Sequence, residues 1–362
     1  MPARGIVAVI SLVTACLLGP MPAEAGKPSG GGSGIKVEEL LKPAGSRDAY
    51  AADINDSGTI AVGAAYWNAT WDYTNNYYAV RWTRASTSDP WVAEDLRSRF
   101  PPNISTRAYL VNDAGSIVLT SFWSPYHVVM TGTGDVIDLG ADIVNDLSNN
   151  DTMVGYRPSP EGIPLFWASP SSPPVELPLL APGYGGNASW FQGAVVVGTA
   201  SDASGAWLVK WVSSGGNWSV HRIVRLPDGA SPGGMNSAGR LVLMVREPTT
   251  ALNEWGQRAA VWDPPYTQPP VYLPTLSGTA DAAGPVLEDG TVVGVVTASS
   301  KTVRNWLPVI WPTPTSLVRL PLLSGAKYGG TNRVNAYRQI AGAVVFVEGW
   351  ATVDHAVIWT LP

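Results

Sequence analysis

The stretch NDSGTIAVG, residues 55–63, decides the fold of this chain, because degenerate copies of it recur along almost the whole sequence. Each copy joins a polar turn to a short apolar segment. The copies are NDSGTIAVG (55–63), NDAGSIVL (112–119), NNDTMVG (149–155), FQGAVVVG (191–198), NSAGRLVL (236–243), EDGTVVG (288–294) and AYRQIAGAVV (336–345). Asn, Asp and Gly tolerate the positive φ of tight hairpins, so each copy predicts a turn followed by a strand.

A second apolar segment follows each copy and usually ends in Trp. These partner segments are AVRW (79–82), HVVM (127–130), LFW (165–167), LVKW (208–211), AVW (260–262), VIW (309–311) and VIW (357–359). The six intervals between Trp82 and Trp359 average about 46 residues, the size of a four-stranded propeller blade. The segments are too short and too rich in Val and Ile for helices. We expect the recurrent Trp residues to pack between neighbouring blades, which is a core role.

The fourth strand of each unit indicates how the repeat closes. Repeats three to six carry it as VELPLL (175–180), RIVRLP (222–227), VYLPTL (271–276) and LVRLPLL (317–323), whereas the seventh repeat stops before it. The missing strand is found at the front of the chain, in Val37–Leu41. The sequence therefore predicts an all-β fold, a seven-bladed β-propeller of four-stranded antiparallel blades. The N-terminal strand joins the last blade and closes the ring, which leaves no open edge.

The N-terminal segment predicts export. Arg4 precedes an apolar run from Gly5 to Leu18, and Ala23-Glu24-Ala25 fits a signal peptidase site. We expect residues 1–25 to be a signal peptide, 26–34 a flexible linker and 35–362 a single propeller domain. The expected location is secreted and extracellular. In the alternative interpretation, Val13-Thr14-Ala15-Cys16 is a lipoprotein box and the protein is anchored through Cys16.

Some of these segments resemble a known repeat family. DINDSGTIAVG (53–63), VNDAGSIVL (111–119) and LPLLSGAKYGG (320–330) are similar to the HAF repeat of secreted, mostly bacterial proteins. In that family a Leu-Pro-Gly-Gly segment precedes an Ala-x-x-Ile-Asn-x-x-Gly-x-Val-Val-Gly segment. The resemblance covers nearly all of residues 35–362, but the Asn-x-x-Gly turn is eroded in repeats three, four and seven. It implies an exported propeller and carries no activity with it.

Composition argues against several kinds of site. Lys and Arg total 23 and Asp and Glu 28, and no basic stripe suggests nucleic-acid binding. Cys16 is the only cysteine, so we expect no thiol chemistry after cleavage. His127, His221 and His355 lie in different repeats without ligand spacing, and the turn at Asp53 lacks the closing acid of a calcium loop. We expect no metal, no cofactor and no transmembrane segment, and a closed ring favours a monomer.

Catalytic motifs are also lacking. The sequence has no Gly-x-Ser-x-Gly elbow and no phosphate-binding loop. Paired carboxylates for glycoside chemistry remain an alternative, since loop acids can converge in the fold. The acids that we expect in connections are Glu161, Asp202, Glu247, Glu254, Asp281 and Asp354.

Aromatic side chains gather in the loops that join the second and third strands of the expected blades. Exposed rings among Asn, Asp and Arg are suited to sugar or peptide recognition. The candidate binding residues are Tyr66, Trp67, Trp71, Tyr73, Trp255, Trp306 and Trp350, and the segment from Trp67 to Tyr78 is the strongest group. The favoured hypothesis is a secreted, non-catalytic module that binds or scaffolds an extracellular glycan or protein. The alternative is a propeller-fold glycoside hydrolase or polysaccharide lyase.

Overall fold

A computed structural model describes residues 34–67, 77–100, 105–121, 127–246, 257–276, 281–297, 306–348 and 351–362. These residues form 28 strands in seven four-stranded sheets and one 3-10 turn, η1 (Arg97–Arg99). The strands of blades 1 to 3 are β2 (Asp48–Ile54), β3 (Ile60–Tyr66), β4 (Tyr77–Thr83), β5 (Val92–Asp95), β6 (Thr106–Val111), β7 (Ile117–Ser121), β8 (His127–Met130), β9 (Val136–Gly140), β10 (Ile143–Leu147), β11 (Met153–Arg157), β12 (Ile163–Trp167) and β13 (Val175–Glu176).

Blades 4 to 7 continue the same order. Their strands are β14 (Gly186–Gln192), β15 (Val195–Asp202), β16 (Gly205–Ser214), β17 (Asn217–Arg225), β18 (Ser231–Met235), β19 (Leu241–Arg246), β20 (Gln257–Trp262), β21 (Val271–Tyr272), β22 (Asp281–Val286), β23 (Val292–Thr297), β24 (Trp306–Thr313), β25 (Ser316–Arg319), β26 (Tyr328–Val334), β27 (Gln339–Glu348), β28 (Ala351–Thr360) and β1 (Lys36–Glu39). No helix in the described ranges has both the length and the apolar character to cross a bilayer.

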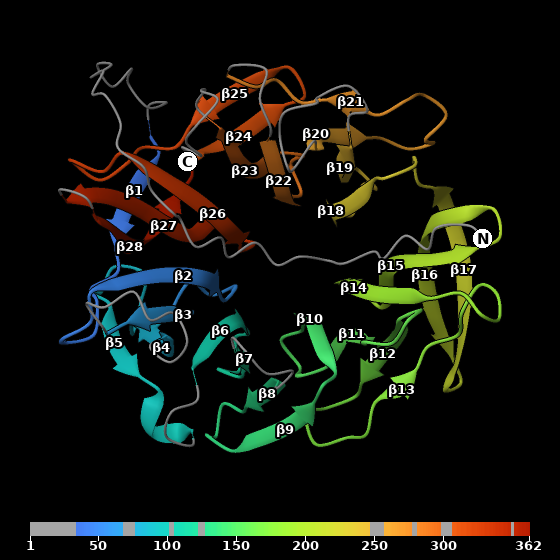
Figure 1. The fold of residues 1–362 in the computed structure, drawn as a ribbon, viewed down its shortest axis with the longest axis horizontal. Helices are drawn as coiled ribbons and strands as arrows, with labels where there is room; N and C mark the ends of the chain where they lie inside the picture. The colour runs from blue at the N-terminus through green and yellow to red at the C-terminus, as the bar shows by residue number, and fades with distance from the viewer. Residues whose placement is uncertain are drawn as a thin grey trace.

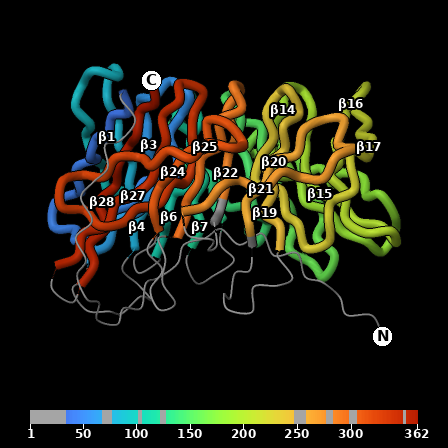
Figure 2. The backbone as a smooth tube through the Cα atoms, turned by 90° about the horizontal axis from the view of Figure 1, so that it is seen from above, coloured from blue at the N-terminus to red at the C-terminus, as the bar shows by residue number. Residues whose placement is uncertain are grey.

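The seven sheets stand around one axis, with the first strand of each blade innermost (Figure 1). Seen edge-on, the blades lie side by side as a single disc (Figure 2). Every pair of neighbouring strands within a blade is antiparallel, and β1 pairs with β28 so that Val37 lies opposite Trp359. The predicted seven-bladed propeller closed by the N-terminal strand is therefore confirmed.

The repeated hairpin owes its shape to the residues that recur in it. Gly58, Gly115 and Gly239 have φ of 68°, 80° and 85°, the left-handed region that favours glycine. In the eroded turns of blades 3 and 7, Asp151 and Arg338 take this conformation, each with φ of 63°. The hairpin is thus kept where its glycine is lost.

The recurrent Trp residues have the predicted core role. Trp82, Trp211, Trp311 and Trp359 are fully buried, Trp167 is 1% exposed and Trp262 is 8% exposed. Trp82 packs with Leu40 and with Ile358, which belongs to blade 7, so the indole fills space between neighbouring blades. The Leu of each Leu-Pro segment is also buried, in the cluster that holds the recurrent Trp of the next blade. These residues are Leu177, Leu226, Leu273 and Leu320. The residues that recur most are those that hold one blade against the next.

Candidate functional site

In each blade the second strand ends and the third begins at one and the same face of the disc, where the fourth strand also ends. We call this the B–C face. The opposite face carries the hairpins between first and second strands, and we call it the hairpin face. On the B–C face, blades 7, 1 and 2 bring together aromatic, basic and acidic side chains that are far apart in the sequence.

Trp67, Tyr78 and Arg97 form a stack on this face of blade 1. The rings of Trp67 and Tyr78 meet edge to face with centroids 5.8 Å apart. The guanidinium carbon of Arg97 lies 4.1 Å from the centre of the Trp67 ring and 5.2 Å from that of Tyr78. The indole N–H of Trp67 donates to the carbonyl of Ala44 at 3.3 Å, and Asp95 accepts from the Nε of Arg97 at 2.6 Å. These contacts hold a half-buried aromatic and cationic platform in one conformation.

Tyr66, also a predicted binding residue, lies on the other face of the blade 1 sheet from Tyr78. It is only 5% exposed, and its ring centroid is 5.0 Å from that of Tyr77, its partner across the β3–β4 ladder. Burial raises the pKa of the Tyr77 phenol above its usual value. Both rings therefore face away from the stack, and the buried Tyr66 offers little surface to a ligand.

The other predicted binding residues are not gathered with Trp67. Trp306 is half-buried at the start of β24 in blade 6, where it pairs with Thr297, and blade 7 separates it from blade 1. Trp71, Tyr73, Trp255 and Trp350 lie outside the described residues. Of the three predicted binding residues that the structure describes, Trp67 alone belongs to the stack.

Two carboxyl groups lie near Tyr66 and Tyr77 at the junction of blades 7 and 1. Asp48 pairs with Tyr66 across the β2–β3 ladder, and, after burial, the charges of Asp354 and Asp48 contribute to the raised pKa of Tyr77. Our placement of Asp354 in a connection was wrong: it lies within β28, and Asp202 and Asp281 likewise fall in strands. The backbone N–H of Asp354 donates to Oδ1 of Asp48 at 3.3 Å. Burial, and next the charge of Asp48, raises the pKa of the Asp354 carboxyl to about 7, although Arg47 opposes this. Among the described residues, the Asp354 carboxyl makes no hydrogen bond or ion pair of its own.

The prediction for Asp354 was wrong because the blade 7 hairpin is longer than the repeat implies. β27 and β28 have ten residues each, so positions expected in a loop are paired: Asp354 lies opposite Val345. Burial also raises the pKa of Asp48, while Arg47, whose Nε is 3.8 Å from Oδ1 of Asp48, lowers it. The Asp48 side chain keeps 18% exposure, so this acid pair is reachable from solvent.

Hydrogen bonds and an ion pair join blades that are not neighbours, near the hairpin face. Nη2 of Arg333 in blade 7 donates to the carbonyl of Asn145 in blade 3 at 2.8 Å, and Nη1 lies 3.7 Å from Oδ1 of Asp146. Nδ2 of Asn149 donates to Oδ2 of Asp56 at 3.0 Å, which joins blade 3 to blade 1. These groups are used within the fold, so the candidate site that includes predicted binding residues is the one on the B–C face.

The turn that resembles half of a calcium loop is likewise occupied. Burial raises the pKa of Asp53 to about 7, and its two oxygens accept the N–H groups of Ile54 and Val111, each at 2.9 Å. Oδ1 of Asn55 accepts the N–H groups of Thr59 and Ile60. Hydrogen bonds of the hairpin and of the next blade therefore account for these side chains.

The three histidines occupy separate environments. His127 lies 3.5 Å from the hydroxyls of Tyr109 and Thr120, and burial lowers its pKa to about 4. Nδ1 of His355 is 2.6 Å from Oε1 of Glu39, a contact between β28 and β1. His221 contacts Ser219 at 2.9 Å. Within the described ranges, no group of three His, Cys, Asp or Glu side chains is placed to hold a metal ion.

The fold and the ring closure define the protein as a β-propeller. No protein-family model and no curated protein sequence matches the chain. Solved structures do match. The β-propeller domain of the Trilobed protease from Pyrococcus furiosus has a TM-score of 0.52 and 10% identity, over 87% of this chain and 94% of that one. That domain has an open velcro topology, whereas β1 pairs with β28 in the present ring.

Two further structures are similar. A catalytically inactive virginiamycin B lyase from Staphylococcus aureus has a TM-score of 0.51 and 10% identity, over 91% of this chain and 100% of that one. A prolyl endopeptidase has a TM-score of 0.51 and 12% identity, over 86% of this chain and 47% of that one. At such low identity, the likeness shows the fold alone.

Proposed function

We propose that this protein is an exported, non-catalytic binding module that recognises an extracellular glycan on the B–C face of blades 7, 1 and 2. The observation that carries the proposal is the stack of Trp67, Tyr78 and Arg97 on blade 1, with the acids Asp48 and Asp354 near Tyr77 at the same face of the disc. An aromatic surface favours the apolar face of a sugar ring, while carboxyl and guanidinium groups bind its hydroxyls.

The test is a glycan array probed with the chain that starts at Gly26. We expect binding to a restricted set of glycans, reduced at least tenfold in Trp67→Ala and in Arg97→Ala. Trp207→Ala is the matched control, because Trp207 also stacks with an arginine, Arg222 at 4.8 Å, but in blade 4. Absence of binding to any glycan, or equal loss in the control, would refute the sugar ligand. A captured protein partner that depends on Trp67 would instead support the protein-binding form of the hypothesis.

A second candidate function rests on the acid pair. A carboxyl with a pKa near 7 beside a second carboxylate is the type of arrangement that general acid catalysis on glycans uses. If the protein is a hydrolase, polysaccharide incubated with it will release reducing ends and Asp354→Asn will stop the release. Binding without turnover by the unsubstituted protein would favour the module.

Export and assembly are part of the proposal and have their own measurements. The mass of the protein recovered from its host distinguishes an N-terminus at Gly26 from a lipid-modified Cys16. We expect the former, and a monomer in light scattering, since the ring closes on itself. A lipidated mass would place the same module at a membrane surface.

A further inference from the structure

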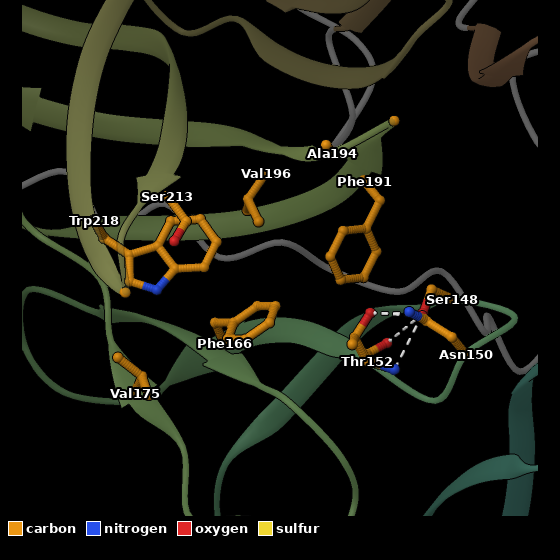
Figure 3. A pocket seen from close by; sticks show the side chains of 12 residues that line it. Ser148, Asn150, Thr152, Phe166, Val175, Phe191, Ala194, Val196, Ser213 and Trp218 are labelled. Carbon is orange, nitrogen blue, oxygen red and sulfur yellow. Dashed lines mark hydrogen bonds between the residues drawn. The ribbon is translucent and has the colours of Figure 1, made fainter.

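A pocket of about 520 Å³ opens on the hairpin face, between blades 3 and 4 and away from the site proposed above. Figure 3 shows the rings of Phe166, Phe191 and Trp218 around the open space, with Ser148, Asn150 and Thr152 joined to one another at one end. Its volume is within the range of pockets that hold small molecules.

The pocket exists because the repeat is broken here. Hairpin hydrogen bonds join neighbouring blades elsewhere: Nδ2 of Asn335 donates to the carbonyl of Asn55, and Nδ2 of Asn112 to that of Ser148, each at 2.8 Å. Gln192 bonds to Asn236 in the same way, and so does Asn236 to Leu287. Among the described residues, no such bond joins the hairpin of blade 3 to that of blade 4.

Two sequence changes remove that bond. Ser148 stands where blade 2 has Asn112, whose Nδ2 reaches the next blade, and its hydroxyl contacts Asn150 and Thr152 of its own hairpin instead. The hairpin of blade 4 is also short, because Gln192 pairs directly with Val195 across a two-residue turn. In blade 1, by comparison, residues 55–59 separate the paired strands. The shortened hairpin leaves the space between the two blades uncovered.

A third change supplies an aromatic wall. The β16–β17 hairpin runs out to the pair Ser214 and Asn217, and it carries Trp218 to the pocket. The ring of Trp218 lies 5.0 Å from that of Phe166 at an interplanar angle of 52°. Phe166 precedes the recurrent Trp of its blade, where blades 5, 6 and 7 have Val261, Ile310 and Ile358, so the aromatic ring is what departs from the repeat. Three departures from the repeat therefore meet at one pocket, as expected of a functional site.

The lining determines which ligand fits. No charged side chain lines the pocket, so a charged ligand would lose hydration without compensation. Three donors have no partner within the described part of the chain: Nδ2 of Asn150, the hydroxyl of Ser213 and the indole N–H of Trp218. Oδ1 of Asn150 already accepts from Ser148 and Thr152. Aromatic walls favour an aromatic ring, and free donors favour an acceptor atom.

We propose that the pocket binds an uncharged aromatic compound that carries a hydrogen-bond acceptor. Its ring lies among Phe166, Phe191 and Trp218, and its acceptor faces Asn150. This site is independent of the B–C face, in its residues and in its ligand class.

Saturation-transfer NMR with benzamide, benzoate, benzylamine and methyl glucoside tests the proposal. We expect transfer to benzamide at least fivefold stronger than to each of the other three. Trp218→Ala removes most of the benzamide signal, whereas Trp207→Ala keeps it. Ala194 lies in an exposed turn at the pocket, so Ala194→Phe fills the space. We expect it to remove the benzamide signal while all three aromatic side chains of the lining stay in place. Circular dichroism and thermal unfolding confirm that each variant is folded.

The outcomes separate this proposal from the first one. Trp67→Ala leaves the benzamide signal unchanged, whatever happens to glycan binding. Equal transfer to benzoate and benzylamine, a benzamide signal that persists in Ala194→Phe, or a methyl glucoside signal that depends on Trp218 would each overturn the aromatic ligand.

Discussion

The indole Nε1 of Trp359 donates a hydrogen bond to the backbone carbonyl of Pro321, 2.7 Å away, and so joins blade 7 to blade 6. Trp211 makes the same bond to Pro178, which joins blade 4 to blade 3. In blade 1 the donor is Trp82 and the acceptor is Leu41, just after β1. The junction of blades 7 and 1 thus uses the same bond as the junctions of blades 3 and 4 and of blades 6 and 7.

Removal of this indole donor will weaken the ring. In Trp359→Phe, the Pro321 carbonyl loses its partner in a buried place, and we expect the free energy of unfolding to fall by about 1–3 kcal/mol. Urea unfolding measures the change. The control is Trp207→Phe, because Trp207 is half-buried and bonds at 3.3 Å to Ser204 of its own blade. An equal or larger loss in the control would argue against an inter-blade role for the bond.

The N-terminal strand is a structural part of blade 7, and two neighbouring leucines test this. Leu40 is fully buried, whereas Leu41 is 66% exposed. We expect Leu40→Ala to lower the free energy of unfolding by about 2–5 kcal/mol and Leu41→Ala to change it by less than about 0.5 kcal/mol. Chemical denaturation of the two variants gives the comparison. Similar values for both would contradict the closure by β1.

Stability should fall as the pH rises toward neutrality. The Asp354 carboxyl has a pKa of about 7 in the folded protein, against about 3.9 in an unfolded chain. Between these values the folded state holds more protons, so its stability decreases from about pH 4 to about pH 7. Asp53 shares the effect. We expect Asp354→Asn to stabilise the protein more at pH 8 than at pH 5.

Asp202→Asn is the control for this pH effect. Hydrogen bonds, first that from the Ser204 hydroxyl, hold the pKa of Asp202 below its usual value, so it is ionised at both pH 5 and pH 8. Its substitution should shift the free energy of unfolding by the same amount at each pH. A pH-independent effect of Asp354→Asn would show that its carboxyl is already ionised at pH 5.

The fold could be predicted from the sequence because the residues that define it are repeated. Seven turns, six Trp positions and the displaced strand near Val37 all report on contacts between neighbouring blades. A contact that occurs only once in the chain leaves no such repeated pattern in the sequence. The stacking of Arg97 on Trp67 joins positions 30 residues apart without any pattern, so composition alone gives no signal for it.

The pocket between blades 3 and 4 is marked in the sequence by departures from the repeat, but we did not predict a site from them. Ser148 in place of Asn and the short turn after Gln192 are visible as eroded copies of the motif. Their consequence, an uncovered pocket, depends on which two hairpins are neighbours in space. The length of β28 was missed in a similar way, since paired residues such as Asp354 resemble loop residues in the sequence.

The central claim is that the ligand binds on the B–C face of blades 7, 1 and 2. Hydrogen–deuterium exchange of the protein, with and without a glycan that the array selects, tests it most directly. We predict slower exchange in residues 44–50, 77–82 and 351–356, and no change in residues 148–152 and 191–196. Protection confined to the hairpin face, or exchange that the glycan leaves unchanged, would contradict the claim.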